Sequence, residues 1–367
     1  MVDDLDKNRC NGCSGCHNIC PLDAIDMTAD NEGFKYPIIN YNKCINCGKC
    51  DAVCPMKYEI ERDNSNDPKV FAAWSLNEEF RINSTSGGIF SELAMQVLNN
   101  LGYVCGAVYA GDNMVEHFIT CSIDDVARLR QSKYVQSDIN YIYRKIGNLL
   151  SGNKIVLFCG TPCEGGGLLN FLKCAGIGKS KLILVDFVCR GSNSPKVYQL
   201  FLEDLEKRYG SGIRKVWFKN KTYGWNRFST KIEFEDGLIY FKDRFSDSYI
   251  RGYIEANLYI RPSCGQCAFK GFPRVSDITL GDFWGISLED KSKDTDKGTS
   301  LVIINSTIGD VIFNDIREKI FFEKKQIEDA IPCNSCMNES IVHGIHRDTF
   351  MKDLDELNIV ENINRFL

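Results

Sequence analysis

The sequence predicts a chain of the mixed α/β class, with a small cysteine-rich domain at residues 1–61 and a larger α/β domain at residues 69–367. Three observations lead to this prediction. Eight cysteines near the N-terminus repeat one spacing, strand patterns alternate with helix patterns between residues 84 and 209, and apolar residues recur with a period of two at residues 215–245. The 367 residues leave ample length for a large domain with its own core.

The N-terminal cysteines form two runs, each spaced Cys-x-x-Cys-x-x-Cys-x-x-x-Cys-Pro. This is the spacing of a two-cluster bacterial ferredoxin, in which the fourth cysteine of each run binds the cluster of the other run. The alternatives are a pair of zinc sites or a set of disulfides. Neither alternative requires both runs to share the same spacing and the same following proline. We therefore expect a ferredoxin-like domain with two [4Fe–4S] clusters in place of a hydrophobic core. One cluster is assigned to Cys10, Cys13, Cys16 and Cys54, and the other to Cys44, Cys47, Cys50 and Cys20.

Composition narrows the class of protein. The net charge is −5 and the basic residues are scattered, so we expect neither a nucleic acid nor a membrane as partner. The acidic N-terminus does not resemble a secretory signal, which predicts a cytoplasmic protein. Eighteen cysteines in a reducing compartment indicate metal or redox chemistry rather than disulfides, and we expect the protein to work under anaerobic conditions.

The larger domain is expected to follow a polar linker at residues 62–69. A segment of hydroxyl residues and glycines, residues 84–88, precedes an apolar helix that begins at Ile89 and ends before Gly102, and a strand is expected at Tyr103–Tyr109. Backbone N–H groups at such a helix start suit an anion, for example a flavin phosphate. An ordinary helix cap explains the same residues, and from this segment alone the cap is favoured.

Two strand–helix units come next. A strand at residues 154–158 leads through a glycine-rich turn, which contains Cys159 and Cys163, into a helix that ends near Leu172. A second strand at residues 182–188 leads through Cys189 into a helix at residues 196–209. Cys163 and Cys189 therefore both lie just beyond the carboxyl ends of strands, where open α/β sheets place their binding sites.

An antiparallel meander is expected at residues 215–245, and the pair Cys264 and Cys267 follows it. By itself, such a pair fits a zinc site or a redox disulfide. Aromatic and basic residues of the meander region are candidates for a substrate pocket, but packing or solvated charge is the commoner role of such residues. These candidates are Tyr223, Trp225, Arg227 and Arg251.

The combined motifs resemble the beta subunits of coenzyme F420-reducing hydrogenases and dehydrogenases. The motifs are residues 84–88, 133–137, 160–163 and 277–285 together with the Cys264/Cys267 pair. Members of that family are iron–sulfur flavoproteins that bind FAD and carry a further [4Fe–4S] cluster. The resemblance implies that this third cluster is bound by Cys163, Cys189, Cys264 and Cys267, with Cys159 as an alternative to Cys163. It also implies that FAD lies near Ser84, Thr85, Ser86, Gly87, Gly88, Lys133, Gly160, Thr161 and Pro162.

The function implied by the resemblance is electron transfer between the ferredoxin-type clusters and a substrate or hydride carrier, through FAD. FAD can connect hydride transfer to one-electron carriers. The alternative is an electron-transfer subunit that docks on a separate catalytic partner and has no substrate of its own. The expected partner is a redox protein or a small-molecule electron acceptor or donor, and the chain is expected to be an oligomer or a subunit of a larger complex. The sequence identifies neither a catalytic residue nor a substrate.

A second cysteine pair, Cys333 and Cys336, is followed by His343 and His346 and is not part of the resemblance. Six residues separate the cysteine pair from the first histidine, which is short for a zinc finger. The neighbouring Pro332 and Asn334 are typical of turns. We therefore favour a surface turn with free thiols over a small metal site.

Overall fold

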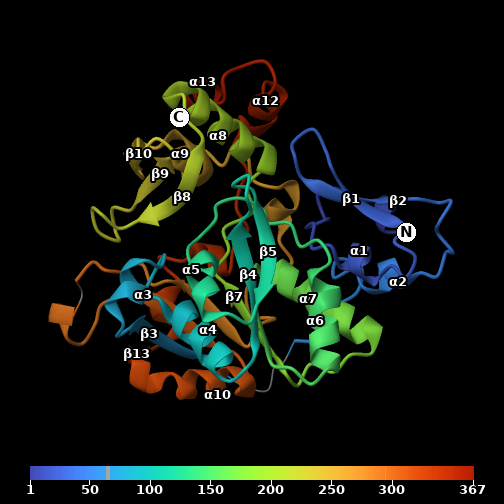
Figure 1. Ribbon diagram of the computed structural model, residues 1–367, viewed down its shortest axis with the longest axis horizontal. Coiled ribbons are helices and arrows are strands. Elements are labelled where there is room, and N and C mark those ends of the chain that lie inside the picture. The colour runs from blue at the N-terminus through green and yellow to red at the C-terminus, as the bar shows by residue number, and fades with distance from the viewer. Residues whose placement is uncertain (63–66, 294) are drawn as a thin grey trace.

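The computed structural model describes residues 1–62, 67–293 and 295–367. Residues 63–66, which form the centre of the expected linker, lie outside the described residues. The chain folds into a small N-terminal domain, a large mixed sheet with helices on both faces, and a lobe built on an antiparallel meander (Figure 1). The predicted mixed α/β class, with a ferredoxin-like domain before a larger α/β domain, is confirmed.

The secondary structure contains three sheets and short as well as long helices. The strands are β1 (Ile25–Ala29), β2 (Lys35–Ile39), β3 (Lys69–Ser75), β4 (Tyr103–Tyr109), β5 (Val115–Thr120), β6 (Val156–Cys159), β7 (Leu182–Phe187), β8 (Ile213–Asn220), β9 (Ser229–Phe234), β10 (Ile239–Asp243), β11 (Ile278–Asp282), β12 (Ser300–Ile304) and β13 (Ile320–Lys325). The α-helices are α1 (Gly15–Ile19), α2 (Lys49–Ala52), α3 (Glu78–Ile82), α4 (Ile89–Asn99), α5 (Val126–Leu129), α6 (Ile142–Ser151), α7 (Pro162–Ala175), α8 (Pro195–Tyr209), α9 (Ser248–Ile254), α10 (Thr307–Asp315), α11 (Ile327–Ala330), α12 (Arg347–Lys352) and α13 (Ile359–Asn364). The 3₁₀-helices are η1 (Val2–Asp4), η2 (Ile123–Asp125), η3 (Pro262–Gln266), η4 (Lys291–Lys293), η5 (Arg317–Lys319) and η6 (Ser335–Met337).

The large sheet has the strand order β13-β3-β12-β11-β7-β6-β4-β5. Its four central strands, β11, β7, β6 and β4, are parallel, and antiparallel strands complete both edges. Helices α4 and α10 cover one face, and α6 and α7 cover the other. Because both faces are covered, the central strands are mostly apolar, as the run Leu182 to Val185 in β7 illustrates.

Helix α7 begins earlier than the sequence suggested. Its first residue is Pro162, and Thr161 and Glu164 form a capping box, so the three glycines expected in a turn lie inside the helix. Glycine in a helix costs about 1 kcal/mol relative to alanine. Neighbouring side chains pack closely where a larger residue would place its Cβ atom, which offsets this cost. A Cβ atom on Gly165 would lie 3.4 Å from Leu184, and one on Gly167 would lie 2.8 Å from Cys13 Sγ.

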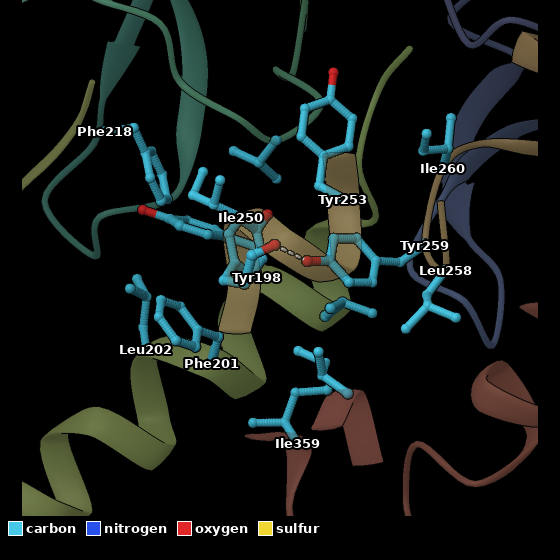
Figure 2. Close-up of a cluster of buried hydrophobic side chains, with 14 of the residues drawn as sticks. Tyr198, Phe201, Leu202, Phe218, Ile250, Tyr253, Leu258, Tyr259, Ile260 and Ile359 are labelled. Carbon is cyan, nitrogen blue, oxygen red and sulfur yellow. Dashed lines mark hydrogen bonds between the residues drawn. The ribbon is translucent and has the colours of Figure 1, made fainter. Parts of the chain in front are cut away.

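The lobe at the top of Figure 1 is built on the predicted meander, which forms the antiparallel strands β8, β9 and β10. Helices α8, α9 and α13 pack against these strands around a cluster of buried aromatic and aliphatic side chains (Figure 2). The rings of Phe201 and Tyr249 stack at a centroid distance of 4.9 Å, and Tyr259 Oη donates a hydrogen bond to the carbonyl of Tyr249. The lobe therefore has its own core beside the large sheet.

The N-terminal domain repeats its backbone as well as its sequence. Gly12 and Asn46 occupy equivalent places in the two cysteine runs and both have left-handed backbone conformations, as do Ser14 and Gly48. Left-handed residues between helical ones turn successive N–H groups toward a common centre, which suits an iron–sulfur cluster. In the described part of the chain, we find no helix with the length and apolar character needed to cross a bilayer.

Candidate iron–sulfur and cofactor site

The cysteines assigned to the outer ferredoxin cluster lie together. Cys20, Cys44, Cys47 and Cys50 line one small cavity between β1, β2 and α2. The backbone N–H of Ala24 donates to Cys20 Sγ at 3.3 Å, a kind of hydrogen bond that tunes cluster potentials. Cys47 is exposed, so this group of thiols lies at the surface.

The cysteines assigned to the inner ferredoxin cluster also form one group. Burial raises the pKa of Cys13 and Cys16, and the thiols of Cys10 and Cys54 raise both values further. Without metal these thiols therefore hold their protons, and cluster binding must release them. Cys13 packs against Gly167 of α7, so this group faces the large domain.

Arg261 supplies a positive charge beside the inner group. It is only 1% exposed, and its guanidinium contacts no carboxylate among the described residues. It donates to the carbonyl of Cys10 at 2.9 Å, and its Nη2 lies 3.9 Å from Cys10 Sγ. A buried cation needs a nearby negative charge, which thiolates bound to an iron–sulfur cluster provide.

A third group of cysteines lies in the large domain. Burial raises the pKa of Cys163, Cys189 and Cys264. The thiols also act on one another, because Cys267 contributes to the raised pKa of all three and Cys189 contributes to that of Cys163. The chain thus gathers four thiols from the start of α7, the end of β7 and the η3 segment.

Cys159 belongs to a different environment. The Cys159 thiol is not among the causes of the raised pKa values of Cys163, Cys189 and Cys264. The pKa of Cys159 itself is raised to about 12, first by burial and then by Asp186. Cys163 rather than Cys159 therefore lies with the other three cysteines. Thr161 Oγ1 is 3.1 Å from Cys163 Sγ, which adds a polar contact to this thiol.

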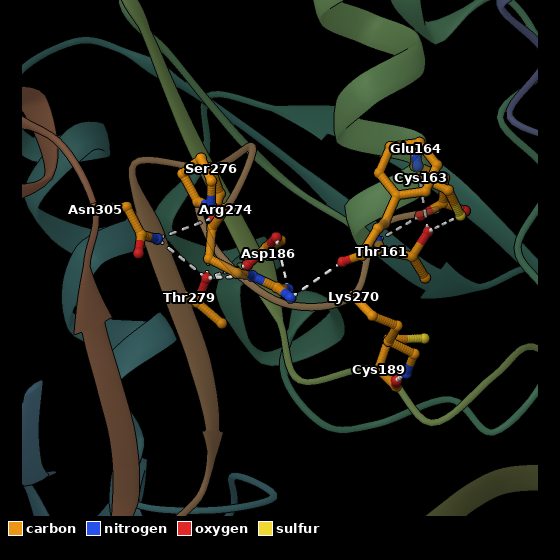
Figure 3. Close-up of polar contacts among 12 residues, drawn as sticks. Thr161, Cys163, Glu164, Asp186, Cys189, Lys270, Arg274, Ser276, Thr279 and Asn305 are labelled. Carbon is orange, nitrogen blue, oxygen red and sulfur yellow. Dashed lines mark hydrogen bonds and ion pairs between the residues drawn. The ribbon is translucent and has the colours of Figure 1, made fainter. Parts of the chain in front are cut away.

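A buried ion pair positions the segment that follows Cys267 (Figure 3). Arg274 Nη2 donates to Asp186 Oδ2 at 3.0 Å, and Nη1 donates to the carbonyl of Phe269 at 3.2 Å. Burial raises the pKa of Asp186, and Arg274 opposes that shift. Lys270 donates to the carbonyl of Cys189 at 2.7 Å, so the segment is attached directly to the third cysteine group.

A large cavity lies at the carboxyl ends of the parallel strands, as expected for an open α/β sheet. Its volume is about 640 Å³, and Cys189 forms part of its wall. Of the nine residues that the resemblance assigned to FAD, seven line this cavity: Ser84, Thr85, Ser86, Gly88, Lys133, Gly160 and Thr161. The cavity therefore brings together three segments that are distant in the sequence.

The other two assigned residues have structural positions outside the cavity wall. Gly87 lies between β3 and β12, where a Cβ atom would come within 2.4 Å of the carbonyl oxygen of Ala73. Pro162 is the first residue of α7 and fits that position because proline needs no N–H partner there. Neither residue is part of the cavity lining.

Lys133 lines the cavity, but its amine is already engaged. Nζ donates to the carbonyls of Arg128, Leu129 and Arg130, at the end of α5. Burial lowers the pKa of this amine to about 7. Lys133 therefore holds the cavity wall in place through backbone contacts.

The N-terminus of α4 opens on the cavity. Its N-cap residue, Gly88, has a φ of 87° and no side chain, so no side chain caps the helix. The neighbouring hydroxyls point elsewhere, since Ser86 Oγ donates to the carbonyl of Thr299 and Thr85 Oγ1 contacts Ser132. No side chain therefore caps α4, and Gly88 serves as its N-cap, with its carbonyl accepting from the Ser91 N–H at 3.1 Å.

The meander lobe closes the opposite wall of the cavity. Lys219 and Asp282 form a buried ion pair there, and Lys219 Nζ lies 4.8 Å from the centre of the Trp284 ring. Of the substrate-pocket candidates, Trp225 stacks on Trp284 at 4.3 Å and donates from Nε1 to Asp282 at 3.0 Å. None of the four candidates, Tyr223, Trp225, Arg227 and Arg251, lines the cavity itself, and Trp225 reaches it only through Trp284, which does.

The two histidines that follow the second cysteine pair have other contacts. His343 Nε2 is 3.0 Å from the carbonyl of Pro262, and the His346 ring stacks on Phe366. No three His, Cys, Asp or Glu side chains in the described ranges, those of the three cysteine groups included, are arranged around a single metal ion. Cys333 is exposed and Cys336 is half-buried, and both line the large cavity.

Three polar residues of the site were given no role from the sequence. His117, Ser137 and Glu164 form a polar group on the cavity wall, with Ser137 Oγ 2.9 Å from His117 Nδ1 and 3.0 Å from Glu164 Oε1. Burial lowers the pKa of His117, so its ring is neutral. Two signals were available: Ser137 belongs to the segment 133–137 used for the resemblance, and Thr161-x-x-Glu164 has the spacing of a capping box.

Comparisons with known proteins agree with this arrangement. Residues 153–330 match the family model for the C terminus of the coenzyme F420 hydrogenase/dehydrogenase beta subunit, and residues 70–143 match the model for its N-terminal part. A 4Fe-4S dicluster domain model matches residues 9–58. The two beta-subunit models together match more than half of the chain.

A solved structure with similarity to this chain comes from the F420-reducing [NiFe] hydrogenase complex of Methanosarcina barkeri, studied by xenon derivatization. The identity is 18%, the alignment covers 83% of this chain and 94% of that chain, and the TM-score is 0.49. Among proteins with curated descriptions, no significant match was found. The resemblance stated from the sequence is confirmed by the family models. The chain belongs to the coenzyme F420 hydrogenase/dehydrogenase beta subunit family, as an iron–sulfur electron-transfer member with a 4Fe-4S dicluster domain at its N-terminus.

Proposed function

We propose that the chain binds FAD in the large cavity and transfers electrons between that cavity and the N-terminal clusters through a third [4Fe–4S] cluster held by Cys163, Cys189, Cys264 and Cys267. One observation carries the proposal: Cys189 of this group lines the cavity, and Cys163 lies at the start of the helix whose Gly167 contacts the inner ferredoxin group. Cys13 is the residue of that group that packs against Gly167. Gly167 follows Cys163 by four residues, about 6 Å along the axis of α7.

The cavity fits FAD in size and chemistry. Its volume of about 640 Å³ lies within the range of small-molecule sites. The uncapped start of α4 suits a pyrophosphate, and the apolar walls formed by Phe90, Leu129 and Leu280 suit a flavin ring. Bound FAD supplies the conversion between hydride transfer and single-electron transfer.

The outer ferredoxin group suits exchange of electrons with a partner. Cys47 is exposed, and large apolar side chains beside it are exposed as well, with Ile45 at 64% and Tyr41 at 60%. Partners that bind transiently use such patches. We therefore propose that an external redox protein docks at this surface. A substrate or hydride carrier would bind at the cavity.

Iron and flavin analysis of anaerobically purified protein tests the proposal. We expect about twelve irons and one FAD per chain, and Cys264→Ala should remove about four irons while FAD still binds. Electron delivery from a reduced ferredoxin, which is too large to enter the cavity, should reduce the flavin of the parent protein and should slow greatly in Cys264→Ala. Cys174→Ala is the matched control, because this half-buried thiol lies at the far end of α7.

A protein that contains all its clusters but neither retains nor binds FAD would contradict the proposal. About eight irons and one zinc per chain, with flavin reduction unaffected by Cys264→Ala, would give these cysteines a structural role instead. Flavin reduction without reaction toward any added hydride carrier would favour an electron-transfer subunit that docks on a separate catalytic partner.

A further inference from the structure

The cysteine pair Cys333 and Cys336 lines the same cavity as Cys189. The sulfur of Cys333 lies against Gly285, where an added Cβ atom would come within 2.7 Å of it. Cys333 is exposed and Cys336 is half-buried, so the pair extends from the surface into the cavity. Two cysteines with two residues between them are spaced for a reversible disulfide.

The surroundings of Cys336 are positively charged. Arg190 Nη1 lies 4.0 Å from Cys336 Sγ. Arg190 Nη2 donates to the carbonyl of Ile254 and to Asn257 Oδ1, both at 2.7 Å, so its partners in the described structure are uncharged. Cysteines that take part in thiol–disulfide exchange occupy electropositive and partly exposed positions, and this pair has both properties.

A single ammonium group connects the pair to the third cysteine group. Lys270 Nζ donates to the carbonyl of Cys336 at 2.6 Å and to the carbonyl of Cys189 at 2.7 Å. Tyr253 lies on the same wall, and the thiols of both Cys189 and Cys336 contribute to the raised pKa that its burial produces. The pair therefore lies beside both the cavity and a residue of the proposed third cluster site.

We propose that Cys333 and Cys336 are a redox-active pair that accepts electrons from the cavity and passes them to an external disulfide. The inference rests on the proposed function for its source of electrons. Two electrons and two protons convert the Cys333–Cys336 disulfide into two thiols. Cys333, at the surface, then attacks the external disulfide and releases its first thiol. Cys336 breaks the mixed disulfide, releases the second thiol and restores the Cys333–Cys336 disulfide.

Differential alkylation of the anaerobic holoprotein tests the pair directly. The protein is equilibrated in dithiol–disulfide buffers of different potential, alkylated and digested. The mass of the peptide that carries both cysteines is then measured by mass spectrometry. We expect the two thiols to be lost together, as one two-electron couple, while the exposed Cys121 stays free. Independent alkylation of the two thiols in every buffer would overturn the proposal without any substitution in the chain.

A second experiment tests whether electrons from the clusters and the flavin reach the Cys333–Cys336 pair. Reduced ferredoxin is the donor, and the acceptors are oxidised glutathione, a small disulfide, and insulin, a protein with disulfides. The faster of the two reactions identifies the source of the external disulfide. Cys333→Ser should slow it by at least about tenfold, because the attacking thiol is gone, while the control Cys121→Ser should not slow it. Reduction of the flavin with no reduction of the Cys333–Cys336 disulfide would overturn this inference alone. Failure to reduce the flavin would contradict the proposed function.

Discussion

Arg261 donates a hydrogen bond from Nε to the backbone carbonyl of Cys10 at 2.9 Å, across 251 residues of sequence. The same guanidinium donates from Nη2 to the carbonyl of Lys35 and from Nη1 to Gln136 Oε1, both at 2.9 Å. The backbone N–H of Cys264, three residues later, donates to the carbonyl of Arg261. One side chain thus joins the inner ferredoxin cysteines to the segment that carries the third cysteine group.

Arg261→Lys should lower the midpoint potential of the inner ferredoxin cluster. The lysine retains a charge but loses the planar set of donors that holds it beside Cys10, and reduction of a cluster adds negative charge that a nearby cation stabilises. We expect a shift of tens of millivolts, since about 59 mV corresponds to a tenfold change for one electron. Redox titration followed by electron paramagnetic resonance measures this potential.

Arg347→Lys is the matched control, because Arg347 also ties the two domains together but does so through Glu32, a residue outside both cysteine runs. Equal potentials in Arg261→Lys and the parent protein would mean that the guanidinium does not tune the cluster.

Gly167→Ala should weaken the contact between the two domains. Alanine favours a helix by about 1 kcal/mol, but its Cβ would lie 2.8 Å from Cys13 Sγ and 3.2 Å from Tyr143 Oη. We expect lower stability and slower electron delivery to the cavity, measured by chemical denaturation and stopped-flow absorbance. Gly178→Ala places its methyl group in open space and should leave both properties near those of the parent protein.

Gly106→Val should lower the affinity for FAD. The Cβ position of Gly106 is 3.4 Å from Leu129 and 3.9 Å from Phe90, which both line the cavity, so larger side chains reduce its volume. Overpacking of about 1–3 kcal/mol corresponds to a loss of affinity of roughly fivefold to 150-fold. Flavin content and fluorescence titration of the flavin-free protein measure the affinity. Iron content should not change, and Gly111→Val, whose Cβ position is open, should bind FAD normally.

Asp247→Asn should remove a pH dependence from the stability of the meander lobe. Burial raises the pKa of Asp247 from 3.8 to about 6. Between these values the folded chain binds the proton and the unfolded chain does not, so the free energy of unfolding of the parent protein falls as the pH rises. The variant cannot ionise, so we expect it to gain up to roughly 3 kcal/mol relative to the parent across this window.

Urea denaturation from about pH 4 to about pH 7 measures this difference. The amide oxygen of asparagine can still accept the hydrogen bond from the Ile250 N–H, which caps α9. Asp348→Asn, at a fully exposed side chain, is the control. Parallel pH profiles for the parent and Asp247→Asn would show that Asp247 does not titrate differently in the folded and unfolded chains.

The sequence was most informative where the chemistry depends on local spacing. The spacing of the cysteine runs predicted two groups that exchange their fourth cysteine, and in the structure Cys20 lies with the second run and Cys54 with the first. Strand β4 was predicted with its observed bounds because its apolar residues continue without interruption. The start of α7 was misplaced, since the contacts that justify glycines inside a helix come from Cys13 and Leu184, far away in the sequence.

The parts of the site that depend on tertiary contacts could not be predicted. Nothing adjacent to Arg261 in the sequence indicates that it reaches Cys10. Lys133 was assigned to FAD, yet its amine caps the carbonyls of α5, because a buried amine takes the nearest acceptors. Cys333 lies in an exposed turn and Cys336 in η6, and only the fold shows that both line the cavity.

The contacts between the two domains also determine how electrons can arrive. Cys13 against Gly167, Arg261 on Cys10, and Arg144 on the carbonyl of Asn18 at 2.6 Å fasten the ferredoxin domain to the large domain at several points. The proposed redox centres therefore keep fixed distances from one another, and electron transfer between them requires no movement of the ferredoxin domain. Internal transfer should then be insensitive to solvent viscosity, and viscosity should affect only the diffusional encounter at the surface beside Cys47.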